Sequence, residues 1–383
     1  MELYIIVGIF QALRLSIFTL MHLDSLRLIN FRNYKELSLQ LPESGALFEG
    51  LNGSGKTNLL ESIHLLCTGR SQRAAARKTM INHNEQSAFV AGCFDYGDSR
   101  VEASLGFDRD KKVVMKINDQ SLGSFSEWFG QRPVVSFGTD DLEIVYGPPE
   151  NRRRFLDMLI SQIDREYFDA LVVYRRNMLC RNSLMGKVTD PLQYEVYEEA
   201  MAQSGAELVF FRRRVVEELR GALNQFYGEI SEKRESVDLL YEPRFKIDCS
   251  SKNEWKNVFC NSLAQQRRRD IEIGFSSTGP HRDEVRFFLD KRVARNFGSQ
   301  GQCRTFALSL KLASVLLIER YRRHSMIFLI DDAVSELDQG RTSRVYPLIE
   351  AKGQVFIATP RLDVPLRAEV LNCTVSDGKV VVR

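Results

Sequence analysis

Residues 50–57 read Gly-Leu-Asn-Gly-Ser-Gly-Lys-Thr and match the pattern G-x-x-x-x-G-K-[ST] at every position. Glycines let the backbone curl so that its N–H groups face phosphate oxygens, and a following helix points its positive end at them. In this pattern the lysine reaches the outer phosphates and the Ser/Thr hydroxyl binds Mg²⁺. The run Ala46–Glu49 predicts a strand before the loop, and residues 57–66 predict a helix after it. We therefore expect a site for ATP and Mg²⁺ formed by Gly50, Leu51, Asn52, Gly53, Ser54, Gly55, Lys56, Thr57 and Asn58.

A second apolar run, Met326–Ile330, ends in the acid pair Asp331 and Asp332. The run is typical of a buried central strand of a parallel sheet, and open α/β sheets bind ligands at the carboxyl ends of their strands. We expect Asp331 to hold Mg²⁺ through water and Asp332 to orient or deprotonate the attacking water. Because Asp is one methylene shorter than Glu, we expect slow hydrolysis. The alternative is an acid pair that only caps the next helix.

The remaining pattern predicts an α/β head that is split in sequence by a helical insertion. Segments 87–94, 99–107 and 112–118 are predicted to form an antiparallel meander. Residues 150–228 are predicted to be helical, and Pro191 separates two helices of a short hairpin. An apolar stripe along the second of these helices predicts helix-on-helix packing. It comprises Leu208, Phe211, Val215, Leu219, Ala222 and Phe226. After residue 275 we expect strands 284–289, 326–331 and 354–358 with helices 302–322 and 341–350.

The amino-acid composition limits the classes of protein and of partner that the chain can represent. The chain has 383 residues, 44% of them apolar, which excludes a disordered chain and leaves room for two domains. The 53 Lys and Arg nearly balance 50 Asp and Glu, so net charge alone does not indicate a nucleic-acid partner. Neither the seven cysteines nor the five histidines have metal-ligand spacing, and no disulfide framework is suggested. We expect a reducing cytoplasm.

The first twenty residues, MELYIIVGIFQALRLSIFTL, are apolar but interrupted by Gln11 and Arg14. The run is short for a membrane span and lacks a basic start and a cleavage site for a signal peptide. We expect residues 1–21 to be a mis-started or disordered extension, with Met21 as the working start. A membrane anchor is the alternative.

The segment Ser299-Gln300-Gly301-Gln302 opens a predicted helix and by itself could be an N-cap. Its place before Asp331 resembles the signature motif of ABC-type ATPases, and Ser335–Asp338 resembles their D-loop. This resemblance implies that the signature of one subunit completes the ATP site of another, in a head-to-tail dimer. The residues it adds to the expected site are Ser299, Gly301 and Gln302.

The insertion between the two motifs is longer than in transporter domains and shorter than in SMC proteins, and it is similar to that of the RecF family. Four strings resemble this family: LRLINFRNY at 26–34, GPPENRRRFLD at 147–157, CRNSL at 180–184 and STGPHRDE at 277–284. Cys180 and Cys303 depart from it, because the family has Gln at both places. Thr359 is a weak candidate for the switch position after the last core strand, and no residue within 134–141 is assigned to the Q-loop.

The resemblance implies an ABC-type P-loop head with a mixed sheet and meander, formed by residues 22–145 and 324–383. Residues 146–323 would form a helical lobe with the hairpin arm and the signature. It also implies an ATP-driven homodimer that clamps single- and double-stranded DNA near gaps, with weak, DNA-stimulated ATP hydrolysis driving release. The expected partners are RecR and RecO, which together assist the loading of RecA in repair and replication restart. We expect a location in the cytoplasm at the nucleoid, without a membrane.

Arginine clusters in the insertion are candidate DNA contacts. Arg152, Arg175, Arg212 and Arg268 represent them, and contacts to phosphate would be independent of sequence and sensitive to salt. Few aromatic residues accompany the clusters, which favours duplex backbone over a single-strand platform. The alternative is a solvated helix face with i,i+4 partners. The alternative function is a cytoplasmic ABC-type ATPase that acts on a protein partner and lacks salt-dependent DNA binding.

Overall fold

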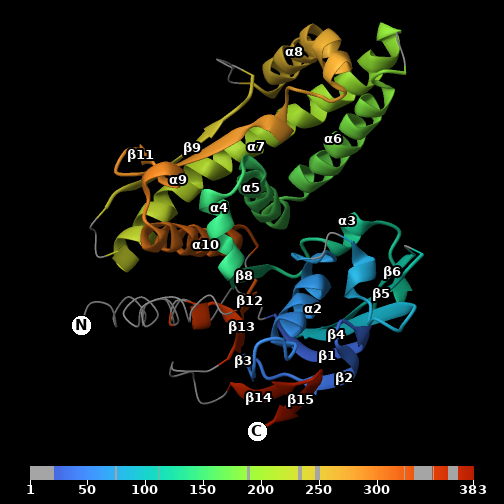
Figure 1. Ribbon diagram of the computed structural model, residues 1–383, viewed down its shortest axis with the longest axis vertical. Coiled ribbons are helices and arrows are strands. Elements are labelled where there is room, and N and C mark those ends of the chain that lie inside the picture. The colour runs from blue at the N-terminus through green and yellow to red at the C-terminus, as the bar shows by residue number, and fades with distance from the viewer. Residues whose placement is uncertain are drawn as a thin grey trace. The chain divides into compact units, whose positions relative to one another are not determined.

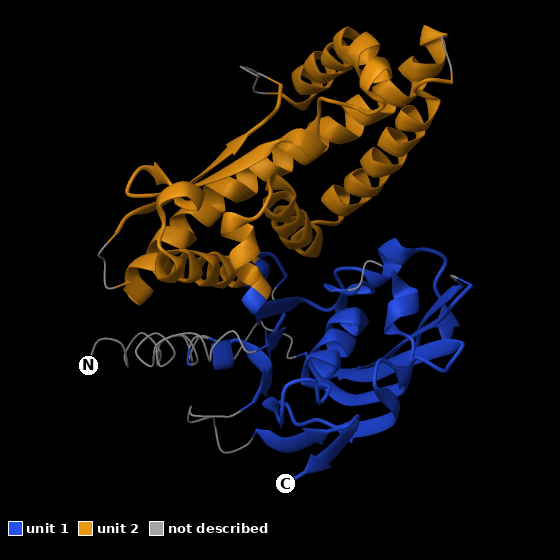
Figure 2. Cartoon of the chain, viewed as in Figure 1, with its two compact units in different colours: residues 1–139, 318–383 blue, residues 140–317 orange. Residues whose placement is uncertain are grey.

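The computed structural model describes residues 21–383 except 74–75, 111, 188–189, 232–234, 246–250, 323, 332–346, 348 and 361–369 (Figure 1). The chain divides into two compact units (Figure 2). Unit 1 comprises residues 1–139 and 318–383, and unit 2 comprises residues 140–317. The chain thus crosses between units a few residues before the expected boundaries at 145 and 324, and the expected extension 1–20 lies outside the described residues.

The central sheet of unit 1 has the order β15-β14-β3-β13-β12-β8. Its strands are β3 (Gly45–Glu49), β8 (Val134–Gly138), β12 (Met326–Asp331), β13 (Gly353–Thr359), β14 (Leu371–Ser376) and β15 (Lys379–Val382). All neighbours are parallel except the antiparallel hairpin β14–β15. Strand β12 lies between β13 and β8 and is buried from Met326 to Ile330, which confirms the predicted central strand. Strand β8 was not predicted.

A second, antiparallel sheet of unit 1 has the order β2-β1-β4-β5-β6-β7. Its strands are β1 (His22–Phe31), β2 (Tyr34–Gln40), β4 (Ser87–Asp95), β5 (Arg100–Asp108), β6 (Val113–Ile117) and β7 (Gln120–Ser121). The predicted meander is confirmed in β4, β5 and β6. Three short helical turns lie along this part of the chain: η1 (Arg77–Met80) between α2 and β4, α3 (Phe125–Trp128) between β7 and β8, and η2 (Thr139–Asp141) directly after β8.

Helix α2 (Lys56–Thr68) packs against strands of both sheets and joins them in one core. Its first residues follow directly from β3 and the glycine-rich loop, as predicted. Eleven of its residues are buried, including Leu59, Ile63 and Leu66. Because its whole circumference is covered, the start of this helix has one fixed position relative to the carboxyl ends of β3 and β12.

Unit 2 is mostly helical, with α4 (Leu142–Tyr146), α5 (Pro149–Ile163), α6 (Arg165–Leu184), α7 (Pro191–Ser231), α8 (Lys252–Ile273) and α9 (Ala294–Phe297). Helix α10 (Gln300–Arg322) begins in unit 2, and its residues from Ile318 onward belong to unit 1. Figure 1 shows α6 and α7 side by side as the predicted hairpin arm, with Pro191 as the first residue of α7. The Tyr194 hydroxyl donates to the Leu184 carbonyl at 3.1 Å across the hairpin. In the predicted stripe of α7 every member is buried except the half-buried Ala222.

A small sheet, in the order β11-β10-β9, and the turn η3 (Pro280–Arg282) complete unit 2. Its strands are β9 (Val237–Glu242), β10 (Glu284–Leu289) and β11 (Arg292–Val293). Strand β10 has the predicted bounds, whereas β9 and α8 were not predicted. Most of the predicted helix 341–350 lies outside the described residues.

Among the described helices, α10 alone is long and apolar enough to span a membrane by length and composition. The apolar window of this helix is 67% buried within the protein. A helix packed in a protein core shows the same combination of length, apolar composition and burial.

Candidate nucleotide-binding site

The loop 50–55 joins β3 to α2 at the carboxyl edge of the central sheet. Gly53 and Gly55 have φ of 82° and 117°, a region that side-chain-bearing residues rarely adopt. A Cβ on Gly50 would lie 2.2 Å from the Val375 carbonyl oxygen. The glycines at these positions are therefore required by the path of the backbone.

Helix α2 begins without a side-chain cap at Gly55 and without an acidic residue in its first turn. The N–H groups at a helix start need partners, and a phosphate group supplies both acceptors and the negative charge that the helix end favours. Lys56 is 4% exposed, and its ammonium donates to the carbonyl oxygens of Gly50 and Leu51 at 2.8 and 3.0 Å. The loop thus curls around a cation at the helix start, which fits a nucleotide phosphate.

The Thr57 hydroxyl donates to Asp331 Oδ1 at 2.9 Å. This hydrogen bond brings together the two sequence motifs, which are 274 residues apart. A hydroxyl and a carboxylate are the oxygen ligands that Mg²⁺ takes when it keeps several waters and binds substrate phosphates. The pair therefore fits Mg²⁺. Within the described residues no group of three or more His, Cys, Asp or Glu side chains could hold a metal ion.

The turn between β1 and β2 forms hydrogen bonds to the phosphate loop 50–55. These contacts were not predicted from the sequence. Asn33 donates to the Ser54 carbonyl at 2.9 Å and accepts from Asn58 at 2.8 Å. The Tyr34 hydroxyl donates to the Gly55 carbonyl at 3.1 Å, and burial raises the pKa of Tyr34, so it remains a donor. The string 26–34 contained these residues, but an alternating pattern does not say which way a turn residue points.

Arg32 and Glu61 fix the same turn to the side of α2. The Arg32 guanidinium donates to both Glu61 oxygens at 2.8 Å, and Glu61 is buried. Arg32 has a φ of 54°, so this contact holds a strained backbone position. The bidentate pair fixes the rotation of α2 about its axis, and with it the direction of Thr57.

Asp331 ends β12 in register with Gly138 of β8 and Ala358 of β13. Thr359 is buried and pairs in register with Glu49, next to the start of the loop. The expected catalytic residue Asp332 and the D-loop-like segment 335–338 lie outside the described residues. Their roles stay predictions.

The signature-like segment lies in unit 2 at the start of α10. The Ser299 hydroxyl accepts from the Gln302 N–H at 3.2 Å, and Gln302 Oε1 accepts from the Ser299 N–H at 2.7 Å. This reciprocal arrangement is a capping box. The Gln302 amide also donates to Glu235 at 3.0 Å. Ser299 and Gly301 remain exposed.

The arginines proposed from sequence to contact DNA differ in exposure. Arg152 is buried and pairs with Glu284 at 3.0 Å, and Arg212 is 2% exposed and pairs with Asp157 at 2.7 Å. Neither guanidinium is accessible to a phosphate, so these two expectations are wrong: the carboxylates that neutralise them come from distant parts of the chain. Arg175 is 48% exposed although it pairs with Asp157, and Arg268 is 94% exposed beside Glu272.

The family described as RecF/RecN/SMC N-terminal domain matches residues 22–379. The protein named DNA replication and repair protein RecF of Ligilactobacillus salivarius is 33% identical over 89% of this chain and 92% of its own length. The protein of the same name from Natranaerobius thermophilus is 32% identical over 94% of this chain and 98% of its own.

Among solved structures, one described as the recombination mediator protein RecF-ATP in the RecFOR pathway superposes with a TM-score of 0.89. It is 30% identical and covers 96% of this chain and 99% of that chain. The Smc head domain of Pyrococcus furiosus, at 18% identity and a TM-score of 0.54, shares the fold. These likenesses confirm the expected head fold with an inserted helical lobe.

Proposed function

This chain belongs to the RecF family of the RecF/RecN/SMC group of ATPases, and from that premise we propose that it is an ATP-dependent DNA-binding protein of recombinational repair and replication restart. The observation that best supports the proposal is the hydrogen bond between Thr57 and Asp331, which joins the two motifs expected to hold ATP and Mg²⁺. The alternative partner-driven ATPase shares this site and differs in its lack of DNA binding.

ATP binds with its phosphates against residues 50–57 and the start of α2. The Lys56 ammonium would then contact the outer phosphates, and Thr57 with Asp331 would hold Mg²⁺. When bound, the metal would supply positive charge to the phosphate oxygens. Asp332 orients or deprotonates the attacking water, and its short side chain keeps hydrolysis slow.

A second copy of the chain completes the site. The exposed start of α10, with Ser299 and Gly301, offers a hydroxyl, N–H groups and a positive helix end to an ATP held by that copy. The capping box and Glu235 hold Gln302 in place before the second copy arrives. Two such contacts close a head-to-tail dimer.

The dimer clamps DNA near single-strand gaps and releases it when ATP is hydrolysed, with DNA stimulating a weak ATPase. Arg175 and Arg268 contact the phosphate backbone. Relatives named DNA replication and repair protein RecF, and a structure described within the RecFOR pathway, support this role and a partnership with RecR and RecO. Through these partners the protein assists the loading of RecA at the nucleoid in the cytoplasm.

Fluorescence anisotropy of a labelled gapped duplex tests the proposal, with ATP, with ADP and without nucleotide. We expect tight binding with ATP alone, weakened by salt. Equal binding in all three states would contradict the ATP-closed clamp. Absence of binding at moderate salt would contradict a DNA partner and favour the partner-driven ATPase.

A further inference from the structure

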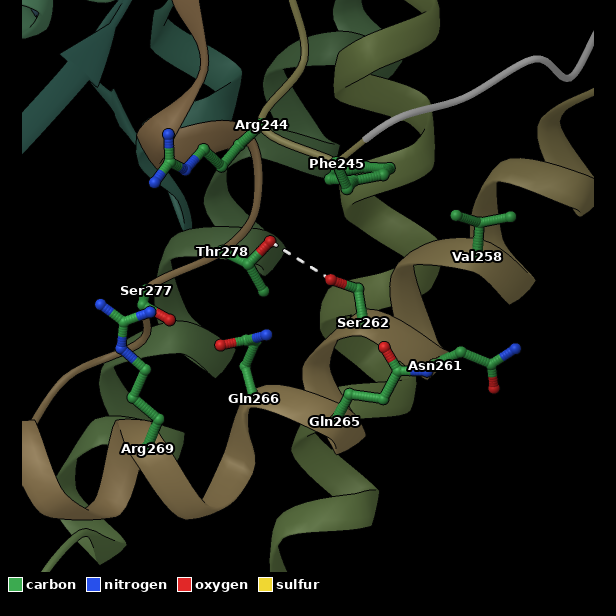
Figure 3. Close-up of a pocket in the computed structure, with 10 residues that line it drawn as sticks. All are labelled: Arg244, Phe245, Val258, Asn261, Ser262, Gln265, Gln266, Arg269, Ser277 and Thr278. Atoms are coloured by element: carbon green, nitrogen blue, oxygen red, sulfur yellow. Dashed lines mark hydrogen bonds between the residues drawn. The ribbon is translucent and has the colours of Figure 1, made fainter.

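Unit 2 contains a pocket of about 530 Å³ between α8, the segment that follows α8 and the residues just after β9 (Figure 3). Its lining contains two arginines, Arg244 and Arg269. The other polar side chains are three hydroxyls and three amides, and none of the lining residues carries a carboxylate. The lining is therefore positively charged and rich in hydrogen-bonding groups, which fits an anionic ligand with polar edges.

The three consecutive arginines of α8 have different surroundings. Arg267 pairs with the buried Glu198 at 2.6 Å, and Arg268 is exposed beside Glu272. Arg269 lines the pocket and, like Arg244, is exposed and has no ion pair within the described residues. In Figure 3 the guanidinium groups of Arg244 and Arg269 lie on the same side of the pocket as Ser277 and Thr278. This side has the donors that a phosphate group needs.

Helix α8 adds Asn261, Ser262 and Gln265 to the lining; the Ser262 and Thr278 hydroxyls lie 3.4 Å apart, and Gln266 lies between them and Arg269 (Figure 3). Side-chain amides donate and accept at once, as the edges of nucleobases require. Phe245 lines the same pocket but is only 6% exposed, with its ring stacked on Phe259 at a centroid distance of 4.7 Å. The edge of an unstacked base would therefore be recognised by the α8 amides and not by stacking on this ring.

We propose that this pocket binds one nucleoside phosphate, with the phosphate between Arg244 and Arg269 and the base against the α8 amides. The nucleotide comes either from a single DNA strand or from free solution, since both carry the same chemistry. Binding of a nucleotide within a DNA strand rests on the proposed function, whereas binding of a free nucleotide does not. Few aromatic residues accompany the arginine clusters, so the sequence favoured binding to duplex backbone. The pocket would add recognition of a single strand.

The test uses the full chain with Lys56→Ala and without ATP, so that the phosphate loop does not take up the probes and ATP, itself a nucleoside phosphate, does not compete for the pocket. Anisotropy of fluorescein-labelled pentathymidylate is measured, followed by competition with thymidine 5′-monophosphate and with inorganic phosphate. The variant Arg244→Gln/Arg269→Gln removes both charges from exposed positions. Its matched control is Arg165→Gln/Arg214→Gln, which removes two charges of unit 2 that already have i,i+4 carboxylate partners.

We expect the pocket variant to bind the pentamer about 100-fold more weakly, at about tenfold for each lost charge-assisted contact. The slope of log affinity against log salt should flatten by about 0.7, because both arginines contact the same phosphate and each neutralised phosphate of a single strand contributes about 0.7. Gln266→Met should bind several-fold more weakly with an unchanged slope, since it loses an amide and no charge. The control should stay within twofold.

Displacement of the pentamer by thymidine 5′-monophosphate supports a free nucleotide as well as a strand. No displacement, together with loss of pentamer binding in the pocket variant, supports the strand alone. Undiminished pentamer binding in the pocket variant overturns the proposal, and so does displacement by inorganic phosphate as strong as that by the nucleotide. Gapped-duplex binding that requires ATP, with pentamer binding unchanged in the variant, would overturn the pocket and leave the proposed function intact.

Discussion

Substitution of Arg181 tests whether a buried ion-pair network stabilises unit 2. Its guanidinium is 0% exposed and donates to Asp270 at 2.8 Å and to Glu198 at 3.0 Å, and both carboxylates are buried. A third contact reaches the Ser276 hydroxyl at 2.7 Å. Arg181→Met keeps the length and apolar volume of the side chain but removes its charge, so the carboxylates lose their shared partner.

The structure sets the size of the effect. In the variant, Glu198 still has its ion pair with Arg267 at 2.6 Å, and Asp270 Oδ1 still accepts the hydrogen bond from the Ser277 N–H at 3.0 Å. The uncompensated atom is Asp270 Oδ2, so the loss should be at the lower end of the range for breaking a buried ion pair, about 3 kcal/mol. The matched control Arg268→Met removes an exposed charge, and we expect a change of less than about 0.5 kcal/mol.

Tryptophan fluorescence during urea unfolding measures this change in unit 2. The chain has two tryptophans, buried Trp128 in unit 1 and buried Trp255 in unit 2, so a Trp128→Phe background makes Trp255 the reporter. We expect a lower unfolding midpoint for Arg181→Met at an unchanged slope. A midpoint equal to that of Arg268→Met would refute the assignment of Arg181 to a buried ion-pair network.

Four further predictions concern the ATP site and the pH dependence. Lys56→Ala should abolish ATP binding, measured by equilibrium dialysis, because it removes the cation at the helix start; sedimentation should then show no ATP-dependent dimer, and a persisting dimer would contradict the sandwich. Asp332→Asn should dimerise with ATP but hydrolyse it at least tenfold more slowly, since proton acceptance contributes about 10²–10⁴-fold; a wild-type rate of phosphate release would exclude Asp332 as the base. Ser299→Arg should spare ATP binding by the monomer and block dimerisation by bulk and charge; light scattering that still shows a dimer would remove Ser299 from the second copy's site. Burial lowers the pKa of His281 to about 4, and its ring accepts from Tyr174 and donates to the Ser276 carbonyl as a neutral imidazole; its contribution to the free energy of unfolding is therefore present above pH 6.5 and should fall by about 3 kcal/mol as pH drops from 6.5 toward 4, a fall that His281→Gln should lack in urea titrations across this range.

Local patterns were sufficient for the elements that carry the phosphate chemistry. Eight consecutive residues specify the curled loop, because its glycines and its lysine act on their own backbone neighbours. The apolar run 326–330 specifies a buried strand, because only a central strand is covered on both faces. The helical insertion and the meander follow from periodicity for the same reason: burial on one face repeats with the period of the element.

Contacts between distant segments required the tertiary structure. Whether an arginine is a DNA contact or an ion-pair partner depends on carboxylates far along the chain, as with Arg152 and Glu284 or Arg181 and Asp270. A cluster such as 152–154 looks the same in sequence in either case, because the attraction acts through space and leaves no local pattern. The support of the phosphate loop by Asn33 and Tyr34, and the approach of Thr57 to Asp331, arise only when α2 packs between the two sheets.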